Sequence, residues 1–447
     1  MTPTLRLNAF LLGVGHHDAA WRHPRTEPRR ITELAHFVEL ARTAERGALD
    51  SVLLADGLSV GPDIRHRVPP VFEPLTLLAA LATATEHIGL IASVSTTWNE
   101  PFHVARQLAS LDHLSGGRAG WNIVSSGQER EAANFNRDRQ PDHPDRYRRA
   151  AEFVDVAVKL WDSWEDDALV LNAGAGVSVD TGRVHEIDHW GADFQVRGPL
   201  TTPRSPQGRP LLVQTDPPAD GIRTAARHVE AVFTVQQTLT EAQAFYGGLK
   251  RQLVAAGRNP DLVPIMAGIT PVIGGTEAEA HALAAELEAL VVPHQALAQL
   301  STALGVDLFG LPLDGPLPEL APVRAGQARL NRYRLLTDLA RREGLTIRQT
   351  IGRFDGSRGY RVVAGTPEQI ADQIERWFTQ GAADGFNVMP PYLPDGLTDF
   401  VDQVVPILRA RGLFRTEYTG RTLRDHYGLP RPANIYTAAP APALVTA

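Results

Sequence analysis

Two kinds of hydrophobic segment alternate along this chain. In the first kind, represented by ITELAHFVELARTAERG at residues 31–47, apolar residues such as Leu34, Phe37 and Ala41 recur every three to four positions and predict an amphipathic helix. In the second kind, represented by IGLIASVSTT at 88–97, the residues are continuously apolar. Such runs are typical of parallel strands buried on both faces by helices. The alternation therefore predicts repeated strand–helix units.

Eight strands can be counted in this pattern, and eight strand–helix units predict a closed (β/α)8 barrel. The prediction is an α/β fold with one domain over residues 1–447, since barrels of this kind exceed the usual domain length. An open, doubly wound sheet is the alternative. No Gly-x-Gly-x-x-Gly motif follows the first strand, which disfavours a dinucleotide-binding sheet. The predicted strands are residues 5–12, 50–56, 88–97, 118–126, 209–215, 230–236, 263–274 and 385–390.

Two long segments interrupt the alternation. Residues at about 165–205 contain HEIDHWGADFQVRG and predict a hairpin excursion. Residues at about 291–360 predict a lid or substrate-binding insertion, because long insertions on barrels commonly have that role. The second segment carries arginines that could contact a carboxylate substrate, although most such residues contact only solvent. These arginines stand at positions 324, 329, 332 and 334.

Composition then narrows the class of protein. The chain has 447 residues, of which 43% are hydrophobic and 21% charged, so it can bury a large core. No stretch reaches the roughly 20 apolar residues of a membrane helix, and MTPTLRLNAF lacks the pattern of a signal peptide, so we expect a cytoplasmic protein. A formal net charge of −7 without a basic run gives no sign of nucleic-acid binding. The absence of cysteine excludes disulfides, thiolate ligands and cysteine nucleophiles.

Polar residues gather where the predicted strands end, and in a barrel the carboxyl ends of the strands form the active site. Each of these residues has an alternative role, because a histidine can bond the backbone, an aspartate can shape a turn and a serine can cap a helix. Adjacent residues on a strand point in different directions, so only one of the two histidines is expected to face the site. The candidates are His16 and His17 after the first strand, Asp56 after the second, Thr96 after the third, and Ser125, Ser126, His143 and Tyr147 after the fourth.

The same stretches resemble one family, the bacterial luciferase-like flavin-dependent monooxygenases related to the nitrilotriacetate and dibenzothiophene-sulfone monooxygenases. The resemblance covers nearly the whole chain. It is carried by LNAFLLGVGHHDAAWRHP, IGLIASVSTTWNEPFHVARQLASLDHLSGGRAGWNIVSS, HPDRYRRAAEFVDVAVKLWDSWEDDA and GTPEQIADQIERWFTQGAADGFNVMPPYLPDGL.

The resemblance implies a two-component enzyme. Reduced FMN from a separate NAD(P)H:flavin reductase would react with O2 to give a C4a-(hydro)peroxyflavin, which would oxygenate a small organic substrate. It also implies a homo-oligomer, a dimer or a tetramer, and no metal.

The resemblance further implies a role for each candidate residue. His16 or His17 is the expected acid or base on the substrate side. The expected contacts with FMN come from Asp56 and Thr96 near the isoalloxazine, Ser125 and Ser126 close to the flavin, and His143 and Tyr147 at the ribityl phosphate.

One loop departs from the family pattern. Family members typically carry Gln-Ala-Gly-Ser-Ser-x-x-Gly after the fifth strand, and its N–H and hydroxyl groups suit a phosphate. Here the segment Thr215–Ala219 reads TDPPA, and Pro217 and Pro218 lack an N–H group. At a separation of about 4 Å and an effective dielectric constant near 20, repulsion between the Asp216 carboxylate and a phosphate would disfavour binding by roughly 4 kcal/mol.

We therefore expect weak binding of reduced FMN through His143, Tyr147 and an arginine such as Arg146 or Arg223. Other functions stay open. The chain could use a deazaflavin, or it could have lost tight flavin binding and act as a small-molecule binding protein. A metal-dependent hydrolase is a further alternative, since histidines and carboxylates at strand ends build such sites. Its ligands would come from His16, His17, Asp56, His143 and Asp216.

Overall fold

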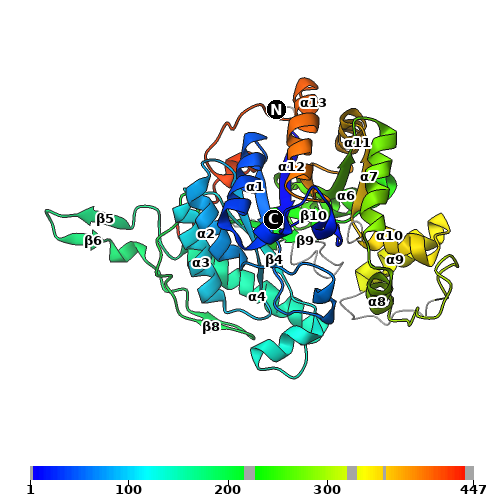
Figure 1. Cartoon of the computed structure of the whole chain (residues 1–447). Helices are drawn as coiled ribbons and strands as arrows, with labels where there is room; N and C mark the ends of the chain where they lie inside the picture. Colours follow the sequence, from blue (N-terminus) through cyan, green and yellow to red (C-terminus); the bar gives the residue numbers. More distant parts are fainter. Residues whose placement is uncertain (1–3, 216–226, 320–329, 356–358, 438–447) are drawn as a thin grey trace, which may run out of the picture.

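A closed barrel of parallel strands forms the centre of the molecule (Figure 1). The computed structural model describes residues 4–215, 227–319, 330–355 and 359–437. Strands follow one another around the barrel in the order β10-β9-β4-β3-β2-β1-β13-β11, and β10 pairs with β11 to close the ring. The predicted (β/α)8 barrel is confirmed, and the open sheet is wrong because this last pairing leaves no edge. The strands are β1 (Arg6–Leu11), β2 (Ser51–Leu54), β3 (Gly89–Ser95), β4 (Ala119–Val124), β9 (Leu211–Thr215), β10 (Ala231–Thr234), β11 (Ile265–Ile273) and β13 (Gly385–Val388).

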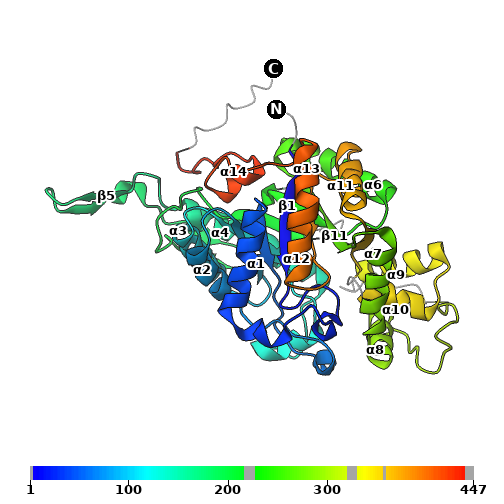
Figure 2. The same ribbon diagram turned by 45° about the horizontal axis from the view of Figure 1, so that its top comes forward.

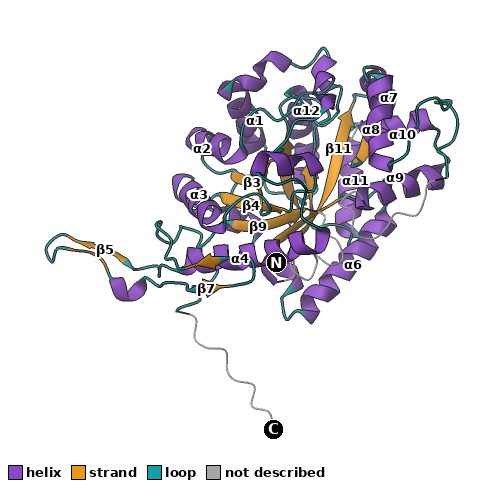
Figure 3. Cartoon of the chain, turned by 90° about the horizontal axis from the view of Figure 1, so that it is seen from below, coloured by secondary structure: helices purple, strands orange, loops and turns teal. Residues whose placement is uncertain are grey.

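Helices surround the strands of the barrel (Figure 3). Their apolar faces pack on the strands in one large core, in which Trp121 and Phe153 are fully buried. The surrounding helices are α1 (Leu34–Arg46), α2 (Pro74–Ala84), α3 (Pro101–Leu114), α4 (His143–Asp162), α6 (Leu239–Ala255), α7 (Glu277–Ala289), α11 (Pro367–Thr379), α12 (Asp395–Asp399) and α13 (Val405–Ala410).

The amino ends of the strands are closed by α14 (Leu423–Tyr427), which sequence reasoning did not predict. The Tyr427 hydroxyl donates to Asn8 Oδ1 inside the barrel at 3.0 Å. A Cβ atom at Gly89 would lie 2.3 Å from Leu423 Cδ1 and 2.9 Å from the Asp50 carbonyl oxygen, so the missing side chain at this position makes room for Leu423 of α14. Figure 2 shows α14 at the end of the molecule opposite to α8. The open mouth of the barrel is therefore its carboxyl end.

The segment at 165–205 contains two hairpins rather than one. The predicted hairpin is formed by β7 (His189–Trp190) and β8 (Gln195–Val196). A second hairpin, β5 (Leu169–Asn172) with β6 (Val177–Val179), projects from the body of the molecule (Figure 1). All four side chains of β5 are exposed.

The segment at 291–360 is helical and has a small core of its own. Its helices are α8 (Pro293–Leu304), α9 (Leu330–Glu343) and α10 (Ile347–Asp355). Leu300 and Ile347 are fully buried between these helices. The four arginines at 324, 329, 332 and 334 lie outside the residues whose side chains the structure describes. The segment ends in β12 (Arg361–Gly365), an unpredicted strand that extends the sheet beside β11.

Within the described ranges, no helix is both long and apolar enough to cross a membrane.

Candidate functional site

The loop after β1 is pinned against the segment that follows β13. The backbone N–H groups of His16 and His17 donate to the carbonyl oxygens of Pro390 and Pro391, at 2.9 and 3.0 Å. Gly15 makes this approach possible, since its φ is +118° and an added Cβ atom would lie 2.5 Å from the Pro391 carbonyl oxygen. Both histidines are consequently held at the mouth of the barrel.

The two histidines point in different directions. The His16 ring packs edge-on against Phe10 with 4.7 Å between ring centroids, and its Nε2 lies 2.8 Å from the Phe10 carbonyl oxygen. Phe10 in turn packs against Phe233 of β10, on the far side of the barrel interior. His17 instead accepts the Ala19 N–H at Nδ1, at 3.1 Å. His16 therefore lies toward the barrel interior, while His17 holds the loop.

Hydroxyl groups join the ends of β3 and β4. Ser95 and Ser126 share a hydrogen bond of 2.7 Å between their hydroxyl oxygens. Thr96 is fully buried, and both its N–H and its hydroxyl donate to the Val124 carbonyl oxygen, at 2.8 and 3.2 Å. The Thr96 hydroxyl is thus used within the fold. Ser125 is half-buried beside this pair.

The first turn of α4 carries a buried arginine, Arg146. The rings of His143 and Tyr147 lie 4.5 Å apart, one turn from each other. Arg146 between them is 6% exposed and donates from Nη1 to the Pro141 carbonyl oxygen at 3.2 Å. No carboxylate among the described residues forms an ion pair with it, and its Nε has no partner there. Burial lowers the pKa of this guanidinium, as expected for a cation that needs an anion.

Other buried polar atoms at the mouth also lack partners within the described part of the chain. They are Thr97 Oγ1 after β3, Gln140 Oε1 in the loop before α4, and Gln214 Oε1 on β9. An unsatisfied buried polar group costs about 1–3 kcal/mol, so several at one end of a barrel indicate a polar ligand. Together with Arg146 they form a set that we call the mouth donors and acceptors. Thr97, Gln140 and Gln214 present oxygen atoms and Arg146 presents a cationic N–H group, and such groups can bind a polar ligand.

Sequence reasoning missed Thr97, Gln140 and Gln214. Thr97 and Gln214 stand at strand ends and could have been found by the rule that selected Thr96. Gln140 gives no such signal, because it lies in a loop and not at the end of a strand. Its side chain is held there by a hydrogen bond from its Nε2 to the Ser126 carbonyl oxygen. It becomes visible only in three dimensions.

Asp56 follows β2 and keeps an exposed surface. Its Oδ1 accepts the Gly57 N–H at 2.8 Å. Desolvation by the surrounding mouth raises the pKa of its carboxyl, and the nearby charges of Glu73 and Glu131 act in the same direction. Asp56 therefore holds a proton at higher pH than an ordinary aspartate does.

Most of the loop that departs from the family pattern lies outside the described residues, including Asp216, Pro217, Pro218, Ala219 and Arg223. Thr215 is described, and its hydroxyl donates to Asn122 Oδ1 at 3.0 Å inside the barrel.

The metal-site alternative gains no support from the structure. No group of three or more His, Cys, Asp or Glu side chains is placed to hold a metal ion among the residues that the structure describes. These residues include His16, His17, Asp56 and His143, whereas Asp216 is not among them.

A (β/α)8 barrel whose mouth holds buried polar atoms without partners is the architecture of an enzyme that binds a polar ligand at its strand ends. The chain belongs to the luciferase-like monooxygenase family, whose family model matches residues 13–384. The resemblance stated from the sequence is thereby confirmed.

Similar proteins extend over nearly the whole chain. N-acetyl-S-(2-succino)cysteine monooxygenase of Bacillus subtilis (strain 168) is 49% identical over 433 residues, which cover 97% of this chain and 98% of that protein. Nitrilotriacetate monooxygenase component A of Aminobacter aminovorans is 47% identical over 433 residues, 94% of this chain and 95% of that protein. The crystal structure of DmoA from Hyphomicrobium sulfonivorans has a TM-score of 0.85 at 30% identity, over 98% of this chain and 99% of that chain. The chain is therefore a flavin-dependent monooxygenase.

Proposed function

We propose that this chain is the oxygenase component of a two-component system. It would take reduced FMN from a separate NAD(P)H:flavin reductase and use O2 to oxygenate a small organic substrate. The observation that carries the proposal is the set of mouth donors and acceptors, among them Arg146, whose Nε has no partner within the described residues. The name of the Aminobacter relative, a component A, supports a separate partner that supplies the flavin.

Reduced FMN, when bound, supplies the electrons that reduce O2 during the reaction. Arg146 would hold the phosphate, since a guanidinium is matched to two phosphate oxygens and stays charged when buried. His143 and Tyr147 flank it on the same helix turn. In this proposal phosphate recognition would lie on α4, and it would depend less on the loop Thr215–Ala219.

The remaining candidates have distinct tasks in this proposal. Ser126 is fixed by Ser95 and would orient the flavin together with Ser125. The Thr96 hydroxyl already donates to the Val124 carbonyl oxygen, so Thr96 would contact the flavin by van der Waals packing and not by a hydrogen bond. Asp56 would border the isoalloxazine with a carboxyl whose pKa is raised. His16, directed toward the barrel interior, would hold or move a proton on the substrate side.

The helical insertion would cover the mouth and exclude water, which favours oxygenation over loss of peroxide. We also propose that the chain forms a homo-oligomer, a dimer or a tetramer, and that the barrel and its insertion form a single domain over residues 1–447.

Anaerobic titration of the protein with reduced FMN and with reduced riboflavin tests the assignment of Arg146. We expect FMN to bind more tightly than riboflavin. Arg146→Gln should weaken FMN binding about tenfold to a hundredfold, because a hydrogen bond to a charged group contributes roughly 1.5–3 kcal/mol. Riboflavin binding should hardly change in that variant.

Arg148→Gln is the matched control, since Arg148 lies on the same helix, is exposed and pairs with Asp145 and Asp193. Equal affinities of the wild-type protein for FMN and riboflavin would show that the phosphate is not recognised. Binding of neither would contradict the whole proposal.

A further inference from the structure

Two sequence motifs that the proposed function leaves unexplained meet beside the barrel mouth. The first, GVGHHDAAWRHPR at residues 13–25, follows β1, and the second, PPYLPDGL at 390–397, follows β13. The N–H group of Leu393 donates to the Val14 carbonyl oxygen at 2.9 Å, which adds a third backbone bond to those from His16 and His17. Residues 12–19 form neither helix nor strand, so contacts of this kind must fix the conformation of the loop.

Arg25, at the end of the first motif, connects this loop to α12. Its Nη1 donates to the Tyr392 hydroxyl oxygen at 2.8 Å. Its Nε and Nη2 donate to the carboxylates of Asp395 and Asp399, at 2.8 and 2.9 Å. These two aspartates stand four positions apart on α12, so their side chains lie on the same face of the helix. We call Arg25, Tyr392, Asp395 and Asp399 the Arg25 clamp.

The charges within the Arg25 clamp are balanced to keep it closed. Burial would lower the pKa of Arg25, but the hydrogen bonds to Asp395 and Asp399 outweigh it, and the pKa is raised. Burial raises the pKa of the Tyr392 hydroxyl, so this group keeps its proton and lies 3.4 Å from Asp399 as a donor. Because Arg25 and Asp395 are partly exposed, their ion pair alone contributes little. The buried Tyr392 hydroxyl is the firmer contact.

His23 fits the loop onto the ring of Tyr392. The two rings are stacked, with 4.8 Å between their centroids and 28° between their planes. His23 Nδ1 accepts the N–H group of Arg25 at 3.3 Å. Burial lowers the pKa of His23, so the ring packs on Tyr392 as a neutral aromatic group at neutral pH.

Tyr392 therefore contacts the loop at both of its ends. A Cβ atom at Gly15 would lie 2.5 Å from the Tyr392 Cα atom, so the chain next to His16 lies directly against this residue. The other end of the loop contacts the Tyr392 side chain through His23 and Arg25. A shift of Tyr392 must consequently move the backbone that carries His16.

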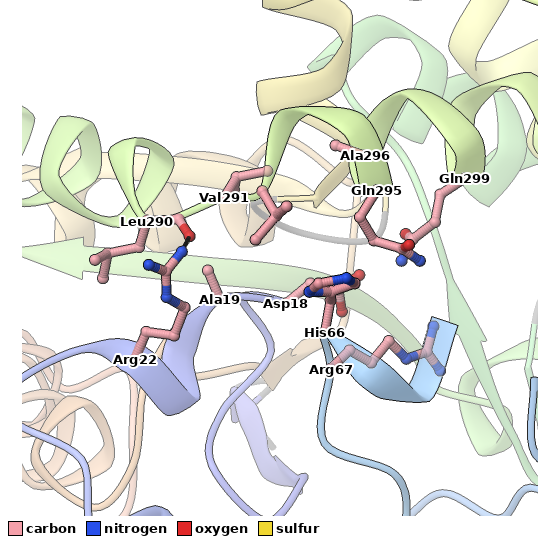
Figure 4. Close-up of a pocket in the computed structure, with 11 residues that line it drawn as sticks. Asp18, Ala19, Arg22, His66, Arg67, Leu290, Val291, Gln295, Ala296 and Gln299 are labelled. Carbon is pink, nitrogen blue, oxygen red and sulfur yellow. Dashed lines mark hydrogen bonds between the residues drawn. The ribbon is translucent and has the colours of Figure 1, made fainter. Parts of the chain in front are cut away.

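The opposite side of the loop contacts the segment between α7 and α8. Arg22 donates from Nη1 to the Leu290 carbonyl oxygen there (Figure 4). Arg22 is exposed, and a hydrogen bond at the surface competes with water. This contact therefore holds the loop less firmly than the buried contacts with Tyr392.

We propose that Arg25 and Tyr392 are positioning residues, which hold the His16 ring in the direction that its proton-handling role requires. The inference rests on the proposed function for that role, but not for the positioning itself. Neither residue touches the reacting atoms in this proposal. Both act through the loop after β1, whose conformation sets where the His16 ring lies.

The reactivity of His16 toward diethyl pyrocarbonate tests the proposal on the flavin-free protein. This reagent acylates neutral imidazole rings that it can reach, and mass spectrometry gives the rate for each histidine. His16 is 1% exposed, so we expect slow labelling in the wild-type protein. Arg25→Gln and Tyr392→Phe should each raise the labelling rate of His16 about tenfold or more, because the loop opens more often once a charge-assisted hydrogen bond is lost.

Two other histidines in the same samples show whether the effect is local. His426 is buried on α14 and should stay protected, whereas His281 is exposed on α7 and should react as in the wild-type protein. Arg46→Gln is the matched control variant, since Arg46 pairs at the surface with Asp402, which follows α12. Unchanged labelling of His16 in both clamp variants, or an equal increase at His426, would overturn the proposal.

Turnover connects the Arg25 clamp to the reaction. With FMN, NADH, an added flavin reductase and an organic substrate that the wild-type protein oxygenates, Tyr392→Phe should lower the oxygenated product formed for each O2 consumed. Made in His16→Asn, the same substitution should cause no further loss, because residues that act through one another are not additive. A further loss of the same size would overturn the proposal. If the wild-type protein oxygenates nothing, the proposed function is rejected, and the labelling of His16 still decides whether the clamp positions it.

Discussion

At the scale of single residues, the two adjacent histidines show how neighbouring identical side chains acquire different tasks. His16 packs on Phe10 toward the barrel interior, whereas His17 accepts a backbone N–H within its own loop. The sequence predicted that only one of them would face the site, and it could not say which. The direction depends on the bend of the loop, which Pro390 and Pro391 impose from the other end of the chain.

His16→Asn tests the proposed proton-handling role. We expect the variant to form less oxygenated product for each O2 consumed and to release more hydrogen peroxide, because a lost general acid or base slows the step by about 10²- to 10⁴-fold. Product and peroxide are measured in the same reaction with an added flavin reductase. His281→Asn is the control, since His281 is exposed on α7. An unchanged ratio of product to peroxide in His16→Asn would contradict the role.

At the scale of elements, α14 closes the barrel and is held by a buried ion pair. Arg424 donates to both carboxylate oxygens of Glu230, at 2.9 and 2.7 Å. Burial by itself would raise the pKa of Glu230, but Arg424 and Arg209 outweigh it, and the pKa is lowered. The periodicity of a five-residue helix is too short to predict, and its partner lies 194 residues away in the sequence.

Glu230→Gln should reduce the free energy of unfolding by about 3–5 kcal/mol at neutral pH, because it leaves a buried guanidinium unpaired. Since the folded-state pKa of Glu230 is lowered, its contribution is present above the unfolded-state pKa and is lost as the pH falls into the acid range. The difference between wild type and variant should therefore shrink at acid pH. Urea unfolding at neutral pH and at pH 4 measures it.

Asp314→Asn is the control. Asp314 pairs with Arg348 on the surface, and loss of this pair should change the free energy of unfolding only slightly. If Glu230→Gln unfolds at the same urea concentration as the wild type at neutral pH, the pair does not stabilise the closure by α14.

At the scale of the whole molecule, the barrel carries additions on two sides. The β5–β6 hairpin projects from one side and the helices α8 to α10 lie on the other (Figure 1). The apolar side chains of β5 include Leu169 and Leu171, which are 46% and 66% exposed. Exposed apolar side chains of this kind commonly lie at contacts between proteins. The single-domain organisation remains a prediction.

The mass in solution tests the proposed homo-oligomer. One chain has a mass of 48.7 kDa, and we expect light scattering after size-exclusion chromatography to give two or four times that value. The measured mass should stay the same over a tenfold range of protein concentration, because a weak association would dissociate on dilution. A species with the mass of one chain across the whole range would contradict the prediction.

The sequence by itself determined the barrel and the location of its mouth. Continuously apolar strands must be covered on both faces, and eight strand–helix units close on themselves, so the strand ends that carry His16, Asp56, Thr96 and Ser125 had to meet at one rim. These inferences depend only on residues that are close in the sequence. The pattern of hydrophobic and polar residues was therefore sufficient to make them.

Tertiary structure alone decided which polar groups at that rim are left without partners. The burial of Arg146 and the closure by α14 both arise from contacts between segments far apart in the chain. Whether a polar group is paired depends on what packs against it, and the sequence of its own segment does not contain that information. The reason is physical, because hydrogen bonds and desolvation act between neighbours in space.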